Sequence, residues 1–197
     1  MKIGIFPGTF DPVHEGHTAF AKTAIAAKHL DRVIMVAEKE PYRKKPFAAW
    51  DHRQAMIERA TEQIEQVDHD YNFAATLAHQ HTMKNMLQCA RTHYGAEHEY
   101  WFLVGSDVFE HMHRWQEVLR AEEYGGFVVA LRDDHTLEWL QQRYLRLPEP
   151  GSQLVTIENQ HPHTSSSAIR QAAREGAALQ QVPSNVAEYI VQHQLYQ

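Results

Sequence analysis

The sequence contains a single cysteine, Cys89, among its 197 residues. One cysteine cannot form a disulfide within the chain, which excludes a disulfide-stabilised scaffold and favours a reducing compartment. No apolar run reaches the roughly 18 residues that a membrane-spanning helix needs. The apolar stretch before the first Pro-Gly pair is too short for the core of a signal peptide. We therefore expect a cytoplasmic protein that does not contact a membrane.

Basic residues are also in the minority, with 19 Lys and Arg against 25 Asp and Glu, so that the net charge is −6 with the histidines neutral. Nucleic acids and anionic membranes attract basic surfaces, so neither is an expected partner. Apolar residues make up 43% of the chain and charged residues 22%. These shares are typical of globular proteins, and the length suits one domain with a hydrophobic core.

Short apolar segments alternate with amphipathic ones, which is typical of βα units around a parallel sheet. Strands are expected at Lys2–Phe6, Arg32–Ala37, Asn72–Leu77, Tyr100–Val104, Gly126–Leu131 and Leu154–Ile157. Helices are expected at Gly16–His29, Trp50–Gln66, Thr82–His93, Val108–Leu119, Glu138–Arg146, Ser166–Arg174 and Asn185–Gln192. Asp51 is the expected N-cap of the second helix. The order predicts one α/β domain over residues 1–197 with a Rossmann-like, doubly wound parallel sheet.

The segment Gly8–His17 (GTFDPVHEGH) lies where the first strand passes into the first helix. Ligands of parallel sheets bind at such strand ends, and helix N-termini attract phosphate. His14 and His17 are three residues apart at the helix start, so both can face one ligand and donate hydrogen bonds to a polyphosphate. Gly16 permits close approach of a phosphate or of backbone. The alternative is a turn with two surface histidines.

The many histidines do not indicate a metal site. The segment from His14 to His17 lacks the HExxH spacing of a zinc peptidase. The histidine pairs at 79–81, 111–113 and 161–163 share no spacing with closed metal sites. We therefore expect no protein-bound metal.

Gly8–His17 resembles the GTFDPxHxGH signature of the HxGH nucleotidyltransferase superfamily, whose members transfer AMP or CMP. A second segment, His163–Arg170 (HTSSSAIR), is similar to the ISSTxIR motif of the same superfamily. Thr164 replaces the usual isoleucine, and Ser167 replaces the usual threonine. In that motif, hydroxyl and amide groups at a helix start hold the phosphates of ATP. Alone, the serine run would suit an ordinary N-cap cluster, but the two motifs together imply a nucleotidyltransferase.

Further segments are similar to the bacterial nicotinate-nucleotide adenylyltransferases. They are Gly105-Ser106-Asp107 followed by Trp115, the strand end Val128–Arg132, and the tail Val182-Pro183…Val186…Tyr189-Ile190…Leu195-Tyr196. The resemblance spans nearly the whole chain. It implies transfer of AMP from ATP to nicotinate mononucleotide, with formation of deamido-NAD and pyrophosphate.

Two alternatives to this function stay open. One is adenylyl or cytidylyl transfer to another phosphorylated acceptor, such as nicotinamide mononucleotide or phosphopantetheine; the segment Lys44–Phe47 (KKPF) is similar to a loop of the phosphopantetheine enzymes. The other is a non-catalytic nucleotide sensor. Loss of a signature histidine or of the serine run would favour a sensor, and the sequence keeps both.

One segment departs from the nicotinate family. The family's Ser-Tyr-Thr-x-Asp-Thr-Leu segment frames the pyridine ring, and its counterpart here is Gln80–Leu87. Thr82 is retained, but His81 replaces the tyrosine and Asn85 the second threonine. The adenylyl-transfer motifs are therefore better supported than the acceptor.

The resemblance also implies the roles of individual residues. His14, His17 and Arg170 are the expected catalytic residues, with Mg²⁺ accompanying ATP. The expected ATP-binding residues are Gly8, Thr9, Phe10, Gly16, Gly105, Asp107, Ser165, Ser166 and Ser167. The expected acceptor-binding residues are Lys44, Arg53, Thr82, Trp115 and Arg132.

Three of the acceptor residues have simple structural alternatives. Arg53 could pair with Asp51 or Glu58 along its helix instead of binding a phosphate. Trp115 could be buried against the sheet instead of stacking on a pyridine ring. Lys44 could be a solvated surface lysine.

Overall fold

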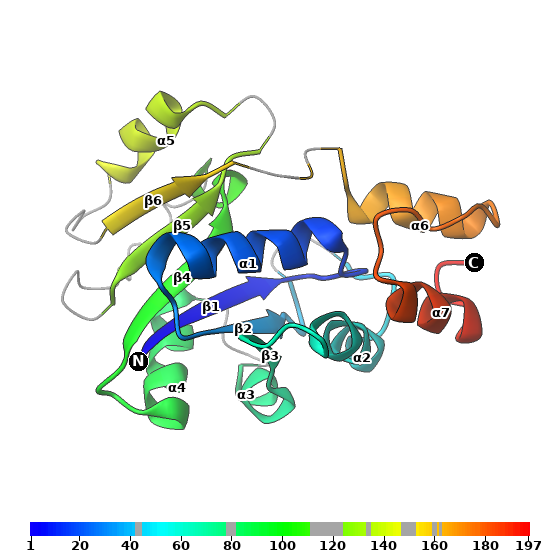
Figure 1. Ribbon diagram of the computed structural model, residues 1–197, viewed down its shortest axis with the longest axis horizontal. Coiled ribbons are helices and arrows are strands. Elements are labelled where there is room, and N and C mark those ends of the chain that lie inside the picture. The colour runs from blue at the N-terminus through cyan, green and yellow to red at the C-terminus, as the bar shows by residue number, and fades with distance from the viewer. Residues whose placement is uncertain are drawn as a thin grey trace.

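Six parallel strands form one sheet at the centre of the computed structural model, in the order β3-β2-β1-β4-β5-β6 (Figure 1). The strands are β1 (Lys2–Gly8), β2 (Arg32–Ala37), β3 (Val67–His69), β4 (Glu99–Gly105), β5 (Gly126–Ala130) and β6 (Gln153–Ile157). The structure describes residues 1–41, 45–77, 82–110, 124–132, 135–146, 153–158, 161 and 163–197. The strand order reverses between β1 and β4, which is where doubly wound sheets bind ligands. The predicted Rossmann-like fold is confirmed.

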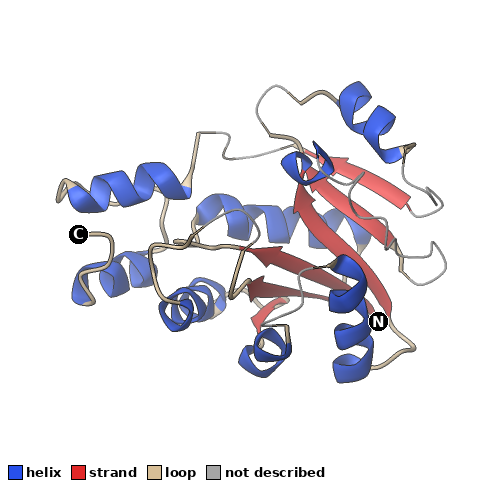
Figure 2. Cartoon of the chain, turned by 180° about the vertical axis from the view of Figure 1, so that it is seen from behind, coloured by secondary structure: helices blue, strands red, loops and turns tan. Residues whose placement is uncertain are grey.

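Helices cover both faces of the sheet. They are α1 (Glu15–Lys28), α2 (Trp50–Thr61), α3 (Tyr71–Thr76), α4 (Met83–Tyr94), α5 (Leu137–Tyr144), α6 (Ser166–Arg174) and α7 (Ser184–Gln192), with a 3₁₀ helix, η1, at Ser106–Glu110. α1 lies in front of the sheet in Figure 1, and α4 lies in front of it in the reverse view of Figure 2. Among the described residues, no helix is long and apolar enough to cross a bilayer.

Strand side chains alternate between two hydrophobic cores, as the period of a strand requires. On β4, Trp101 and Leu103 enter the core shared with α1, α2, α6 and α7. Tyr100, Phe102 and Val104 enter the opposite core, which is shared with α3, α4 and α5. Burial on both faces explains why the strands read as continuous apolar runs.

β1 extends past its predicted end at Phe6 and includes Pro7 and Gly8. Glu38 N–H donates to the Gly8 carbonyl at 2.9 Å, so the backbone polar groups of Gly8 point toward β2. Those of Pro7, one residue earlier, point toward the side of β4, but the pairing of β1 with β4 already ends at Ile5. The missing N–H of proline therefore costs no ladder hydrogen bond.

The strand predicted at Asn72–Leu77 is wrong, because this segment forms helix α3. The Asp70 carboxylate accepts a hydrogen bond from Phe73 N–H at 2.9 Å and so caps the helix. Phe73 and Ala74 are buried in the core beneath α4. The strand of this region is β3, which ends just before the cap.

Two other predicted helices also differ from the structure, beyond the shifts of one or two residues at the ends of α1, α4, α5 and α7. Ala49, not Asp51, occupies the N-cap position of α2, and Asp51 lies inside the first turn, where its charge suits the positive helix end. α2 ends at Thr61, short of Gln66. Of the helix predicted at Val108–Leu119, the described part belongs to η1, and the remainder lies outside the described residues.

The last two helices lie beyond the carboxyl end of β1, away from the N-terminus (Figure 1). They carry most of the serine motif, which is the segment His163–Arg170, and most of the C-terminal tail that begins at Val182. This arrangement brings the end of the chain to the segment that follows β1.

Candidate nucleotide-binding site

The two signature histidines stand at the beginning of α1. His14 occupies the N-cap position, and His17 follows in the first turn. Their rings stack with centroids 3.7 Å apart and planes inclined by 26°. His14 N–H donates a hydrogen bond to Nδ1 of His17 at 3.2 Å. Because Nδ1 accepts, the proton of the neutral His17 ring resides on Nε2, which makes Nε2 a hydrogen-bond donor.

His14 is a neutral residue at physiological pH. Its side chain is 7% exposed, and burial, helped by the positive charge of Arg132 and by the nearby His161, lowers its pKa to about 4. Nδ1 of His14 is buried and forms no hydrogen bond with any part of the chain that the structure describes. Since His14 is uncharged, the stacked rings do not bring two like charges together. The ring of His17 can therefore donate a hydrogen bond to an anionic ligand without repulsion between the two histidines.

Gly16 makes room for the ring of His14. A Cβ atom at this position would lie 3.1 Å from Nδ1 of His14 and 3.4 Å from Cβ of His161. The glycine expected to admit a phosphate thus admits an imidazole. His161 therefore lies beside the site, although no motif in the sequence indicates this histidine.

Gly8, Thr9 and Phe10 carry the chain from β1 toward α1. Phe10 adopts φ 47°, in the left-handed region, and its ring is buried. The ring packs edge-on against His17, with centroids 4.9 Å apart, and a Cβ at Gly8 would lie 2.9 Å from it. Phe10 therefore supports the His17 ring from inside the protein, so that only its backbone could contact a nucleotide.

The sequence alone does not indicate a role for Asp11, although it lies inside the Gly8–His17 signature. Its buried carboxylate accepts hydrogen bonds from Phe47 N–H at 2.7 Å, Ala48 N–H at 3.1 Å and the hydroxyl of Tyr196 at 2.8 Å. One carboxylate thus joins its own segment to two distant ones. Asp11 belongs to the Gly8–His17 signature and Tyr196 belongs to the C-terminal tail. Nothing in the sequence indicates that these two side chains are in contact.

The serine motif docks directly onto the N-terminal motif. The Ser166 hydroxyl donates to the carbonyl of Pro12 at 2.9 Å, across 154 positions. Arg170 donates from Nη1 to the carbonyl of Asp11 at 2.7 Å and from Nη2 to the Ser167 hydroxyl at 3.1 Å. The N-terminal ends of α1 and α6 therefore lie together, and two helix starts of this kind favour an anion between them.

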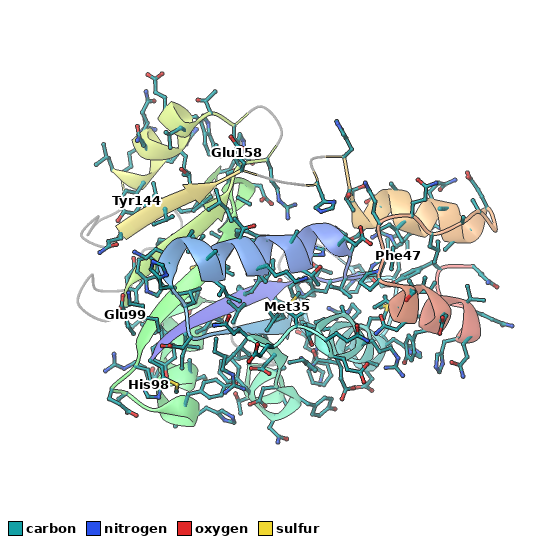
Figure 3. The ribbon with its side chains drawn as sticks, in the orientation of Figure 1. Met35, Phe47, His98, Glu99, Tyr144 and Glu158 are labelled. Atoms are coloured by element: carbon teal, nitrogen blue, oxygen red, sulfur yellow. The ribbon has the colours of Figure 1, made fainter. Side chains whose placement is uncertain are left out.

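The start of α6 is capped, and its arginine is supported by an aromatic ring. The Ser165 hydroxyl accepts a hydrogen bond from Ala168 N–H at 3.2 Å. The guanidinium of Arg170 lies 4.4 Å from the centroid of Phe47, and that of Arg174 lies 5.1 Å from it. Phe47 projects beside α6 and α7 (Figure 3). The ring restricts where the Arg170 side chain can point.

The carboxyl end of β4 brings together another part of the predicted site. Nε of Arg132 lies 3.6 Å from Oδ1 of Asp107. A Cβ at Gly105 would lie 2.3 Å from this carboxylate oxygen and 2.7 Å from Nε of Arg132, so the pair requires glycine there. The charge of Arg132 also lowers the pKa of His14. Asp107 and Arg132 therefore belong electrostatically to the same site as the histidines.

Arg53 has a role within the fold instead of the expected contact with an acceptor phosphate. It is 1% exposed, and burial lowers its pKa. Nη1 donates to the carbonyls of Thr9 and Glu38, both at 2.8 Å, and Nη2 donates to that of Lys39 at 3.2 Å. Nε donates to the carbonyl of Ala48 at 3.3 Å. Arg53 therefore joins the loops that follow β1 and β2.

Thr82 is the N-cap of α4, and its hydroxyl accepts a hydrogen bond from Asn85 N–H at 3.2 Å. A helix that connects parallel strands runs antiparallel to them, so α4 begins at the edge of the sheet that holds the site. Lys44, His81 and Trp115 lie outside the described residues. Among the described residues, no three His, Cys, Asp or Glu side chains form a group suited to a metal ion.

Comparisons with known proteins agree with this geometry. Residues 5–172 match the model of the cytidylyltransferase-like family. The chain is 30% identical to a probable nicotinate-nucleotide adenylyltransferase of Thermomicrobium roseum, over 99% of this chain and 91% of that protein. It is also 30% identical to one of Thermus thermophilus over the full length of both.

A solved structure has the same fold. Plasmodium falciparum nicotinic acid mononucleotide adenylyltransferase complexed with NaAD superposes with a TM-score of 0.76 at 15% identity, over 99% of this chain and 97% of that one. The histidine motif, the serine motif, the strand order and the relatives lead to one conclusion. The chain belongs to the cytidylyltransferase-like family of nucleotidyltransferases, in the branch of the nicotinate-nucleotide adenylyltransferases.

Proposed function

We propose that the chain transfers AMP from ATP to nicotinate mononucleotide and releases pyrophosphate, in the cytoplasm that its single cysteine favours. The observation that carries the proposal is the contact between the two phosphate motifs. Arg170 of the serine motif donates a hydrogen bond to Asp11 of the histidine motif at 2.7 Å. This contact holds two helix starts together, which supports a single site for the triphosphate of ATP between them.

The reaction is an in-line substitution at the α-phosphorus of ATP. An oxygen of the acceptor's phosphate forms a new bond to that phosphorus, while the bond to the bridging oxygen breaks and pyrophosphate leaves with the electron pair. A phosphate monoester is already a nucleophile at neutral pH, so no protein nucleophile is needed. Positioning the two reactants contributes about 7–11 kcal/mol in well-oriented reactions.

The chain's own residues orient the phosphates and stabilise their charge. His17 would donate from Nε2 to the reacting phosphate, because its Nδ1 accepts the bond from His14. Arg170 would provide the fixed positive charge for the leaving pyrophosphate, since its guanidinium is oriented by Asp11 and Phe47. Mg²⁺ would arrive with ATP as part of the substrate, which suits a cation that keeps several waters and phosphate oxygens as ligands.

Nicotinate mononucleotide as the acceptor is supported by the name of the two relatives at 30% identity. The altered segment Gln80–Leu87 is compatible with this acceptor if backbone amides read the pyridine carboxylate. Replacement of tyrosine by His81 then changes little, because every residue other than proline has an N–H. The described part of this segment begins at the exposed start of α4.

Pyrophosphate release measured with each pair of nucleotide and acceptor tests the proposal. We expect release with ATP and nicotinate mononucleotide, little with CTP, and a dinucleotide of the expected mass in the same mixture. Release with CTP alone, or nucleotide binding without release under any pair, would contradict it. The second result would identify a sensor.

A further inference from the structure

A network of hydrogen bonds lies beside the site and joins side chains that have no part in the proposed reaction. The Ser106 hydroxyl lies 2.9 Å from Nδ1 of His135, and Nε2 of His135 lies 3.1 Å from a carboxylate oxygen of Glu110. The Ser106 hydroxyl also accepts a hydrogen bond from Arg132 N–H at 2.9 Å. The ring of His135 stacks on Trp139, with centroids 3.8 Å apart and planes 7° from parallel.

The direction of every bond follows from the chemistry of its ends. An ionised carboxylate only accepts, so Nε2 of His135 carries a proton toward Glu110. In a neutral ring Nδ1 is then an acceptor, and the Ser106 O–H donates to it. The remaining capacity of the Ser106 oxygen accepts the N–H of Arg132. The donors and acceptors of this hydrogen-bond network are thus all paired in one consistent direction, and such networks fix the positions of their members.

Serine, histidine and glutamate together also occur in hydrolases, but this arrangement is not a nucleophilic one. Ser106 is 0% exposed, so no substrate can reach its oxygen. That oxygen already accepts a backbone amide hydrogen, which reduces its ability to attack. The geometry therefore indicates support of a neighbouring group instead of chemistry at Ser106.

The supported group is Arg132. Its N–H is held by Ser106, and its carbonyl accepts a hydrogen bond from His135 N–H at 3.1 Å. The backbone N–H and carbonyl of Arg132 are thus both hydrogen-bonded to residues of this network. Its side chain extends to Asp107, and its charge acts on His14. A change in the backbone of Arg132 would therefore change the position of a guanidinium at the site.

We infer that His135 is a positioning residue: through Ser106 and its own backbone it fixes Arg132 in the orientation that binds the phosphorylated acceptor. This inference rests on the proposed function, because it takes Arg132 to act on the acceptor. Loss of the His135 side chain should raise the KM for the acceptor by about 3- to 10-fold, the range that one neutral hydrogen bond covers. The KM for ATP should change less than about twofold.

Three substitutions at one position distinguish the two hydrogen bonds of the ring. In H135N, an amide oxygen near the place of Nδ1 can still accept from Ser106, while the bond to Glu110 is lost. In H135Q, the longer side chain can reach Glu110, while the bond to Ser106 is lost. We expect H135N to stay near the wild-type acceptor KM, and H135Q to resemble H135A.

A matched control separates positioning from general loss of stability. Nε2 of His93 also lies 3.1 Å from a carboxylate oxygen, that of Asp70, away from the site. H93A removes the same kind of bond and should leave the acceptor KM unchanged. Thermal unfolding of each variant checks that the protein remains folded at the assay temperature.

The decisive experiment is a double-mutant cycle with R132A, which begins by identifying the acceptor that the wild-type protein uses. If His135 acts through Arg132, H135A adds less than about twofold to the acceptor KM of R132A. Effects that multiply, or an H135A variant with the wild-type KM, would overturn the inference. Wild-type protein that does not turn over nicotinate mononucleotide would contradict the proposed function instead. The cycle is then run with the acceptor that is used.

Discussion

The hydroxyl of Tyr196 donates a hydrogen bond to the buried carboxylate of Asp11 at 2.8 Å, across 185 positions of the chain. The same carboxylate oxygen accepts from Ala48 N–H, and the other accepts from Phe47 N–H. The last residues of the chain thus secure the motif that carries the two histidines. Burial together with the nearby Asp11 charge raises the pKa of Tyr196, so its hydroxyl remains a donor throughout the physiological range.

The first prediction concerns this bond. Y196F removes one donor from a buried carboxylate, which should lower the free energy of unfolding by about 1.5–3 kcal/mol. Urea denaturation measures the change. Y71F provides the control, because the Tyr71 hydroxyl lies at 3.5 Å from Asp51 and its side chain is 52% exposed. Equal losses in the two variants would show that the Tyr196–Asp11 bond contributes nothing beyond a surface contact.

The second prediction concerns His17. H17A should reduce kcat by about 10²–10³, the usual effect of losing one preorganised donor to a developing charge. The fold should remain, because His17 is only partly buried. Single-turnover rates and circular dichroism of the variant check both parts. H193A serves as a control at an exposed histidine outside both motifs. An H17A enzyme with half of the wild-type rate would refute this role.

The third prediction concerns Arg170. R170A should raise the KM for ATP more than the KM for the acceptor, because the guanidinium lies between the two helix starts that we propose to hold the phosphates. Arg174 stacks on the same Phe47 ring but makes no hydrogen bond to the N-terminal motif within the described residues. R174A should therefore have a smaller effect. Steady-state kinetics with each substrate varied in turn measure the difference. A defect confined to the acceptor KM would contradict the assignment.

The fourth prediction concerns pH and His14. Its pKa is about 4 in the folded protein, below the ordinary value of 6.5. Between these values the unfolded chain binds a proton that the folded protein does not. The contribution of His14 to stability is therefore present above pH 6.5 and is lost as the pH falls toward 4, by up to about 3 kcal/mol.

Denaturation of the wild-type protein and of H14N at several pH values between 4 and 7 tests this sign. The difference in unfolding free energy between them should change across the window, with the wild-type protein losing more as the pH falls. His69, whose pKa is also lowered by burial, titrates equally in both proteins and cancels in the difference. A constant difference would mean that His14 titrates alike in the folded and unfolded states.

The parts of the fold that local pattern determines could be predicted from the sequence. β2 and α6 have the predicted bounds, since each is a clear run with an unambiguous period. The strand prediction at Asn72–Leu77 is wrong because its apolar residues suit a strand, whereas the Asp70 cap and the packing of Phe73 under α4 favour a helix. Tertiary packing overrides a weak local preference in such short segments.

The placement of the two motifs could be predicted, because each motif is one strand end or one helix start, while their part in nucleotide binding stays a prediction. The role of Arg53 could not be predicted, because its guanidinium binds carbonyls of three separate segments that meet only in the folded chain. The same holds for the contact of His135 with Ser106 and for that of Tyr196 with Asp11. Contacts of this kind leave no periodic signal in the sequence.

The acceptor is the central claim, and one comparison tests it most directly. The catalytic efficiency kcat/KM is measured for nicotinate mononucleotide and for its amide, nicotinamide mononucleotide, at the same ATP concentration. A backbone amide that donates to the nicotinate carboxylate makes a charge-assisted bond worth about 1.5–3 kcal/mol, so the acid should be preferred by roughly 10- to 150-fold. Equal use of the two nucleotides, or activity only with phosphopantetheine, would contradict the proposed acceptor.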